Sequence, residues 1–229
     1  MERAEIEAVL GSRGWLAAYG AAFRAAVFER THIARISPDQ VLFHVGDLAG
    51  GIHGIARGAF AVSVATAAAT PAVATIVRSG VWFGNGPIVA ERRRLLSFRA
   101  AEPSVTLHLP LAAIRELSAA SIEAASAFAD LASVNMQVAV RVVSDLLIPG
   151  ADRRIAATLR RVTRADEGEG PDDPLGFRLR QAELGEMANA SRRSVVRALA
   201  AFEAKGWIGI SRHRIAVRDA AALERFAHG

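Results

Sequence analysis

Closely spaced arginines mark the last quarter of the chain as its most chemically informative part. Arg192 and Arg193 are adjacent, Ser194 follows them, and Arg197 comes one helical turn later. Guanidinium groups bind phosphates and can hydrogen-bond the O6 and N7 atoms of guanine together. Residues three or four apart share one face of a helix. This spacing predicts a basic helical face suited to nucleic acid, and the alternative interpretation is a solvated arginine surface.

The surrounding residues have the pattern of a helix-turn-helix. The segment Leu179–Leu199 contains two short amphipathic stretches joined at Asn189, a residue type that tolerates the left-handed backbone of a tight turn. Ser191 can cap the second helix by accepting a backbone N–H hydrogen bond. The residues expected to face inward and pack the two helices together are Leu184, Val195 and Leu199.

A hairpin is expected directly after this motif. The second helix should run through Phe202 and stop at Lys205-Gly206, and two short apolar runs then follow, Trp207–Ile210 and Ile215–Val217. They leave the basic segment Ser211–Arg214 at the tip of the hairpin. A basic wing beside a basic helix predicts a winged helix-turn-helix that places its second helix in the major groove of DNA.

The elements that must carry this motif begin with a helix over Gly14–Glu29, whose apolar residues recur near every 3.6 positions. After Thr31 short apolar runs alternate with turn residues, which predicts a β-roll or barrel. The glycines at 50, 51, 54 and 58 are interpreted as turns, as is Gly84–Pro87. The expected strands are Val41–His44, Phe60–Val64, Val73–Val77, Leu95–Phe98 and Val105–Leu109.

From Leu111 the pattern is helical, with a short helix to Ala119 and a long one over Ser121–Leu147. The long helix carries two apolar stripes, so one can pack on its own domain while the other needs a partner chain. The alternative is one helix buried on two sides within a monomer. The first stripe is Ile122, Ala125, Ala129, Ala132, Met136, Ala139, Val143 and Leu146, and the second is Phe128, Leu131, Asn135, Val138 and Val142.

Pro149-Gly150 is expected to end the long helix and to act as a hinge. Ala151–Val162 is predicted to be helical, and Arg164–Phe177, polar and rich in Pro and Gly, to be a solvated loop.

Composition limits the function further. The 229-residue chain has 52% apolar and 22% charged residues, so we expect a globular protein. It has no cysteine, which excludes disulfides and cysteine-bound metal. Residues 1–150 carry 13 basic and 12 acidic side chains and residues 151–229 carry 15 and 11, so the basic excess lies with the arginine motif. No signal peptide is expected, and the uncharged stretch Ala59–Val77 is expected to form two strands and a turn rather than a membrane span.

The chain resembles the cyclic-AMP receptor protein and fumarate–nitrate regulator superfamily of bacterial transcription factors, because its motifs follow one another in the order found in that superfamily. The resemblance includes the segments Leu42–Asp47, Ile55–Gly58 and Trp82–Gly84, followed by the long helix, the hinge and the helix-turn-helix. It implies an α+β protein with an N-terminal cyclic-nucleotide-binding-like β-roll (a double-stranded β-helix), a long dimerisation helix and a C-terminal winged helix-turn-helix. The implied domains are residues 1–119, 120–148 and 149–229.

The resemblance also implies a cytoplasmic homodimer that binds a pseudo-palindromic DNA site and contacts RNA polymerase. Arg192 matches the family's guanine-binding arginine and Arg197 a second arginine that contacts base or phosphate. Arg193 stands where many members have a glutamate, and since a cation cannot accept a hydrogen bond, the half-site should differ from the usual one. The DNA-contacting residues expected from motif and resemblance are Arg180, Gln181, Ser191, Arg192, Arg193, Ser194, Arg197, Arg212 and Arg214.

The effector site departs from the family pattern. Members that bind cyclic AMP hold the ribose with a Gly-Glu pair and the phosphate with an Arg-Ser or Arg-Thr pair. Here Asn85 follows Gly84 in place of the carboxylate, and Leu95 follows Arg94 in place of the hydroxyl residue.

The polar pair that would reach the base is replaced by Ala139 and Val140 on the long helix. We therefore expect a sensor domain that either binds a non-standard small-molecule effector or is silent, and the alternative is a cyclic-nucleotide-responsive regulator with a diverged pocket. No cofactor is predicted, and the effector is unknown. The run Arg92–Arg94 is either another anion site or a solvated turn. The candidate effector-binding residues are Gly84, Asn85, Arg94 and Asn135.

A different class, a cupin-like metal-binding protein or enzyme, would need clustered ligands on adjacent strands. Four histidines, His32, His44, His53 and His108, fall in or beside the β-roll, but their separations match no ligand motif. They are interpreted as scattered structural residues, and the protein is expected not to be an enzyme. A third class, a cyclic-nucleotide-binding module without DNA, is disfavoured by the basic winged helix.

Overall fold

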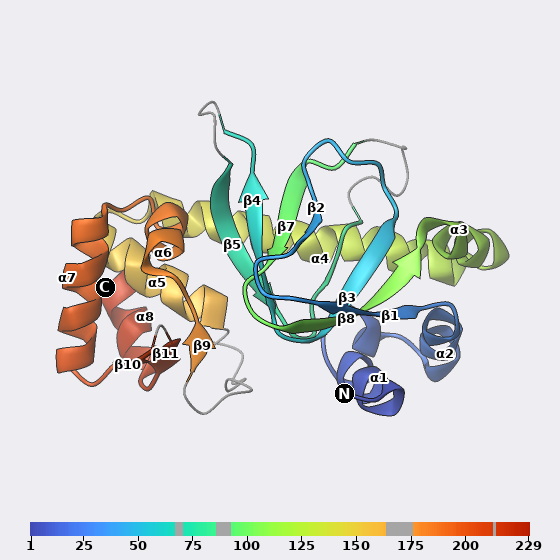
Figure 1. Cartoon of the computed structure of the whole chain (residues 1–229), viewed down its shortest axis with the longest axis horizontal. Helices are drawn as coiled ribbons and strands as arrows, with labels where there is room; N and C mark the ends of the chain where they lie inside the picture. The colour runs from blue at the N-terminus through green and yellow to red at the C-terminus, as the bar shows by residue number, and fades with distance from the viewer. Residues whose placement is uncertain (67–70, 86–92, 164–175, 213) are drawn as a thin grey trace. The chain divides into compact units, whose positions relative to one another are not determined.

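The computed structural model describes residues 1–66, 71–85, 93–163, 176–212 and 214–229 (Figure 1). The chain forms two units, one of residues 1–71 and 76–139 and one of residues 72–75 and 140–229. They are described in turn.

Two antiparallel four-stranded sheets make the predicted β-roll, which is thereby confirmed. One has the order β1 (His32–Ile36), β8 (Ser104–Pro110), β3 (Gly51–Arg57) and β6 (Trp82–Phe83). The other has the order β2 (Val41–Phe43), β7 (Leu96–Ala100), β4 (Ala59–Val64) and β5 (Ala72–Arg78). Between them lies an apolar core that includes Phe43, Phe60, Phe83 and Phe98.

Helices cover the β-roll through a second apolar cluster. They are α1 (Arg3–Ser12), η1 (Trp15–Ala18), α2 (Ala21–Glu29), α3 (Leu111–Ala120) and the start of α4 (Ile122–Leu147). Trp15 is central, since its ring packs against Phe23, Trp82 and Phe128. Its indole Nε1 donates to the backbone carbonyl of Ala127 at 2.8 Å, which satisfies a buried polar group.

The single helix predicted over Gly14–Glu29 is wrong. The segment forms the 3-10 turn η1 and then α2, because Tyr19 and Gly20 adopt extended backbone between them. The break lets the rings of Trp15, Tyr19 and Phe23 contact one another, so tertiary packing overrides the local periodicity.

The glycines at 51 and 54 are not turns, contrary to the prediction, but lie inside strand β3. A Cβ atom at Gly54 would stand 2.5 Å from the Trp82 ring, and one at Gly51 would stand 2.1 Å from the carbonyl oxygen of Leu109. These positions carry glycine because neighbouring groups approach the strand too closely for any side chain. Gly58, with φ of +92°, does form the turn between β3 and β4.

The long helix α4 has one exposed and one buried apolar stripe. All eight residues of the first stripe are exposed, among them Ile122 at 88% and Met136 at 64%. In the first unit the second stripe packs on the β-roll domain, with Phe128 and Leu131 buried and Asn135 and Val138 partly buried; Val142, in the second unit, is also partly buried. Within the first unit α4 is therefore buried on one side only, which favours the prediction of two distinct stripes over a helix buried on both sides.

The second unit contains α5 (Ala151–Thr163), α6 (Gln181–Met187), α7 (Arg192–Ala204) and α8 (Ala220–His228), with a three-stranded sheet ordered β10 (Ile208–Ser211), β11 (Arg214–Val217) and β9 (Phe177–Arg178). Its core includes Ile155, Leu159, Leu184, Leu199 and Phe202. The winged helix-turn-helix is confirmed. Helix α8, which Asp219 caps through the backbone N–H of Ala222, was not anticipated.

Two boundaries in this unit differ from the prediction. Phe177 was assigned to a loop but pairs with Ile215, because its strand completes the edge of the wing sheet; residues 164–175 of that loop lie outside the described part. Ser211 and Arg214 were assigned to the wing tip but pair with each other, since the hairpin is tighter than expected. The tip is Arg212, with φ of +42°, and His213, which is also not described.

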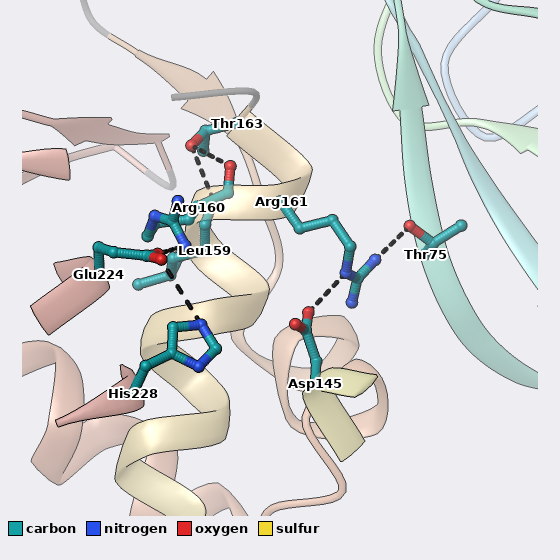
Figure 2. A network of polar contacts seen from close by, with 8 residues as sticks. All are labelled: Thr75, Asp145, Leu159, Arg160, Arg161, Thr163, Glu224 and His228. Carbon is teal, nitrogen blue, oxygen red and sulfur yellow. Dashed lines mark hydrogen bonds and ion pairs between the residues drawn. The ribbon is translucent and has the colours of Figure 1, made fainter. Parts of the chain in front are cut away.

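Ionic contacts hold helix α5 to its neighbours (Figure 2). Arg161 donates to the carboxylate of Asp145, near the end of α4, at 2.6 Å, and both side chains are largely buried. Arg160 pairs with Glu224 of α8, which also faces His228. The pair of Arg161 with Asp145 is thus shielded from water, whereas Glu224 is 45% exposed in its pair with Arg160.

In the described part of the chain, none of the helices combines the length and apolar composition that crossing a membrane requires. The uncharged stretch Ala59–Val77, predicted to form two strands and a turn, contributes β4 and most of β5, and residues 67–70 between them lie outside the described part.

Candidate DNA-binding surface and effector site

The turn between α6 and α7 has the conformation that its sequence predicts. Asn189 has φ of +45°, and the backbone N–H of Ala190 donates to the carbonyl of Gly185 at 2.9 Å. A Cβ atom at Gly185 would lie 3.0 Å from the Ala190 oxygen, so glycine allows the two helices to approach. Ser191 caps α7 by accepting from the backbone N–H of Ser194 at 3.1 Å.

The inward and outward faces of α7 are divided as expected. Leu184, Val195 and Leu199 are at most 1% exposed and lock the two helices together. Arg192 and Arg193 are exposed and make no hydrogen bond or ion pair with the described residues. Exposed guanidinium groups at the start of a helix are chemically suited to bind an external anion.

Arg197 lies on the same outward face but has a partner within the protein. One guanidinium nitrogen lies 2.9 and 3.1 Å from the two carboxylate oxygens of Asp152, a residue in the first turn of α5. The Arg197 side chain is 65% exposed, so the pair is held weakly and can exchange for a phosphate. Asp152 was not anticipated from the sequence, since only the fold brings the two residues together.

The other predicted DNA contacts surround this face. Arg180 is the residue before α6 and lies 3.6 Å from the buried carboxylate of Glu183, while Gln181 opens the helix and is exposed. On the wing Arg212 is exposed, whereas Arg214 turns back and donates to the carbonyl of Gly176 at 2.8 Å.

A further basic group on the wing was missed. The guanidinium of Arg218 lies across β10, so close that a Cβ atom at Gly209 would be 2.7 Å from its Nη2 atom. A glycine within a predicted strand was the only signal of this approach.

The four candidate effector residues lie in one cluster of the β-roll unit. Asn135 of α4 donates through Nδ2 to Oδ1 of Asn85 at 2.6 Å and to the carbonyl of Trp82 at 3.1 Å. The amide of Asn85, which replaces the family's carboxylate, is thus already bonded to the long helix.

Arg94 is 5% exposed and directed into the roll. Its guanidinium lies 3.6 Å above the Phe43 ring and donates to the carbonyls of Gly51 at 3.2 Å and Gly84 at 3.4 Å. Burial lowers the pKa of Arg94, and the nearby Asp47 opposes the shift. Of the predicted run Arg92–Arg94, Arg92 lies outside the described residues.

The histidines are not scattered, contrary to the prediction. His32, His108 and His53 stand in register on β1, β8 and β3, and the rings of His53 and His108 stack 4.5 Å apart. Burial, followed by the charges of His108 and Arg94, lowers the pKa of His53 to about 3. This row of histidines was not predicted, because β1 and β3, which carry two of the three, were not among the expected strands. His44 lies elsewhere, and the described residues contain no cluster suited to a metal ion.

A β-roll, a long helix and a basic winged helix-turn-helix together define a two-domain regulator that binds DNA. Two family models match in the same order, a cyclic nucleotide-binding domain over residues 33–121 and a Crp-like helix-turn-helix domain over residues 153–226. The chain belongs to the cyclic-AMP receptor protein and fumarate–nitrate regulator family of transcription regulators.

Individual relatives agree with this assignment. The cAMP-activated global transcriptional regulator CRP of Pasteurella multocida is 24% identical over 75% of this chain and 83% of that protein. The structure of FixK2 from Bradyrhizobium japonicum is 15% identical, with a TM-score of 0.73 over 87% of this chain and 98% of that one. The c-di-GMP responsive regulator CLP of Xanthomonas campestris is 19% identical, with a TM-score of 0.66 over 86% and 99%. The solved structures thus share the fold.

Proposed function

We propose that the protein is a homodimer that binds a pseudo-palindromic operator with one α7 helix for each half-site. The observation that carries this proposal is the exposed apolar stripe of α4, in a chain that also has an exposed basic recognition face. An apolar stripe of this length on a water-facing helix is stabilised when a second copy covers it.

The proposed dimer seam runs from Ile122 to Leu146, which spans about 36 Å at 1.5 Å per residue. Val143 is 56% exposed and Leu146 41%, so the stripe stays exposed along its whole length. Four of the eight stripe residues are alanines, whose small side chains let two helices approach closely, and the larger side chains among them can pack into the partner helix. We assign residues 120–148 to dimerisation, with residues 1–119 as the sensor and 149–229 as the DNA-binding domain.

In the proposed complex Arg192 hydrogen-bonds a guanine, and Arg197 leaves Asp152 for a base or a phosphate. Arg193 adds a donor where relatives carry an acceptor, so the preferred half-site changes at that base pair. Contacts to the DNA backbone are assigned to Arg180, Gln181, Ser191, Ser194, Arg212 and Arg214.

We infer that the sensor takes an effector other than cyclic AMP. Asn85 bonds to Asn135 and Arg94 to backbone carbonyls, so groups at the positions that hold ribose and phosphate are already engaged within the chain. The P. multocida relative is named as cAMP-activated and the X. campestris relative as c-di-GMP responsive, so effectors differ among the relatives. We further propose that the protein acts in the cytoplasm, contacts RNA polymerase there, and catalyses no reaction.

The test is binding to a duplex selected from a random pool, followed by fluorescence anisotropy. Replacing Arg192 and Arg197 by Ala should weaken binding at least about thirtyfold, because each contact to a base contributes about 1–3 kcal/mol. Arg225→Ala, which removes an exposed arginine of α8, is the matched control and should bind as the wild type. Equal affinity of the double variant and the control would contradict the proposal.

A further inference from the structure

Two helix ends converge on one arginine in the second unit. Arg154, in the first turn of α5, donates through Nη1 to the carbonyl of Ile148, just after α4, at 3.2 Å. It also donates through Nε to the carbonyl of Ala188 at 2.8 Å and through Nη2 to that of Asn189 at 2.9 Å. Ala188 and Asn189 form the turn of the helix-turn-helix, so one side chain connects that turn to the end of α4.

The chemistry at this point favours a guanidinium. The last carbonyls of a helix have no partner within it and carry partial negative charge. Arg154 faces such carbonyls after both α4 and α6, and it is half-buried, so water competes with these bonds less than at the surface. A planar fork with several donors can bond all three oxygens at once, whereas the single ammonium of lysine cannot hold them in the same geometry.

We propose that Arg154 is the positioning residue that fixes the helix-turn-helix relative to the end of α4, and through it the half-site separation that the dimer accepts. The inference rests on the proposed dimer and its two-fold operator. In such a dimer the two α4 helices are joined, and each recognition helix is placed by its link to α4. Changing the operator by one base pair moves a half-site by about 3.4 Å and rotates it by about one tenth of a turn, which a rigid link resists.

The experiment measures the affinity of operators whose central spacer is lengthened or shortened by one base pair, together with a single half-site duplex. The wild type should discriminate against the altered spacers by about tenfold or more, since a fixed separation tolerates little change. Arg154→Gln should reduce this discrimination to about threefold or less and leave affinity for the single half-site unchanged, because the base-contacting residues stay in place. Arg153→Gln changes the neighbouring arginine, which has no bond to the described residues, and should match the wild type.

Arg154→Lys keeps the stem and the charge, and it should also lose spacer discrimination. It serves as the second variant if Arg154→Gln lowers the thermal midpoint below the assay temperature. Wild-type discrimination in a folded Arg154 variant would overturn the inference while leaving the proposed function intact. A wild type that shows no spacer preference at all would instead overturn the two-fold function on which the inference rests.

Discussion

The exposed seam of α4 gives the most quantitative prediction. Met136 is 64% exposed and Val143 56% in the single chain, so covering them with a second copy buries most of each side chain. This burial contributes about 1 to 2 kcal/mol for each side chain, given about 1.5–3 kcal/mol for complete burial. Four such side chains, two from each copy, amount to about 4–8 kcal/mol, or at least about a thousandfold in the dimer Kd.

Replacing both Met136 and Val143 by Asp should therefore convert the proposed dimer to monomer at micromolar concentration, as measured by sedimentation equilibrium. The acidic side chains also add the cost of removing charge from water. Gln137→Asp with Ser144→Asp places the same acids on exposed positions of the same helix that lie outside both stripes, and this control should remain dimeric. A Met136/Val143 variant that sediments as a dimer with the wild-type Kd would refute the assignment of the seam.

Three further predictions concern single residues. Asp152→Asn releases Arg197 and should strengthen binding to non-specific DNA by about two- to fivefold, with a steeper dependence on salt, in anisotropy titrations. Gly54→Ala places a methyl group against the Trp82 ring and should lower the free energy of unfolding by about 1–3 kcal/mol in urea melts. The pKa of His53 is about 3 in the folded protein and about 6.5 in an unfolded chain, so between these pH values the unfolded chain binds a proton that the folded protein does not. The free energy of unfolding should therefore fall as the pH is lowered from about 6.5 toward 3. His53→Gln should flatten that part of the stability profile.

Each of these predictions has a contrary outcome. Unchanged non-specific affinity in the Asp152 variant would mean that the pair with Arg197 does not restrain DNA binding. Wild-type stability of Gly54→Ala would show that β3 and Trp82 can separate without loss. A stability profile between pH 6.5 and 3 that is the same with and without His53 would show that this residue does not cause the acid dependence.

Features set by neighbouring residues could be predicted from the sequence. The two stripes of α4 follow from helical periodicity, and the turn at Asn189 and the cap at Ser191 depend on residues within one or two helical turns. The predicted inward face of α7 was confirmed for the same reason, since Val195 and Leu199 stand four residues apart on one face of that helix and are both buried.

Features that depend on contacts between distant parts of the chain could not be predicted from the sequence. Gly54 resembles a turn residue until Trp82 is known to lie against it, and Asp152 cannot be linked to Arg197 before α5 is placed beside α7. The row of histidines needs the register of three strands that come from well-separated parts of the chain. Such long-range pairings leave no local signal in composition or periodicity.

The central claim is that two recognition helices of a dimer bind a two-fold DNA site. Its most direct test is selection of bound duplexes from a random pool by the wild-type protein. The expected result is an inverted repeat whose half-sites are centred about 10 base pairs apart, or a multiple of that spacing, with a guanine opposite Arg192. Enrichment of an unrepeated motif, or of no motif at all, would contradict the account.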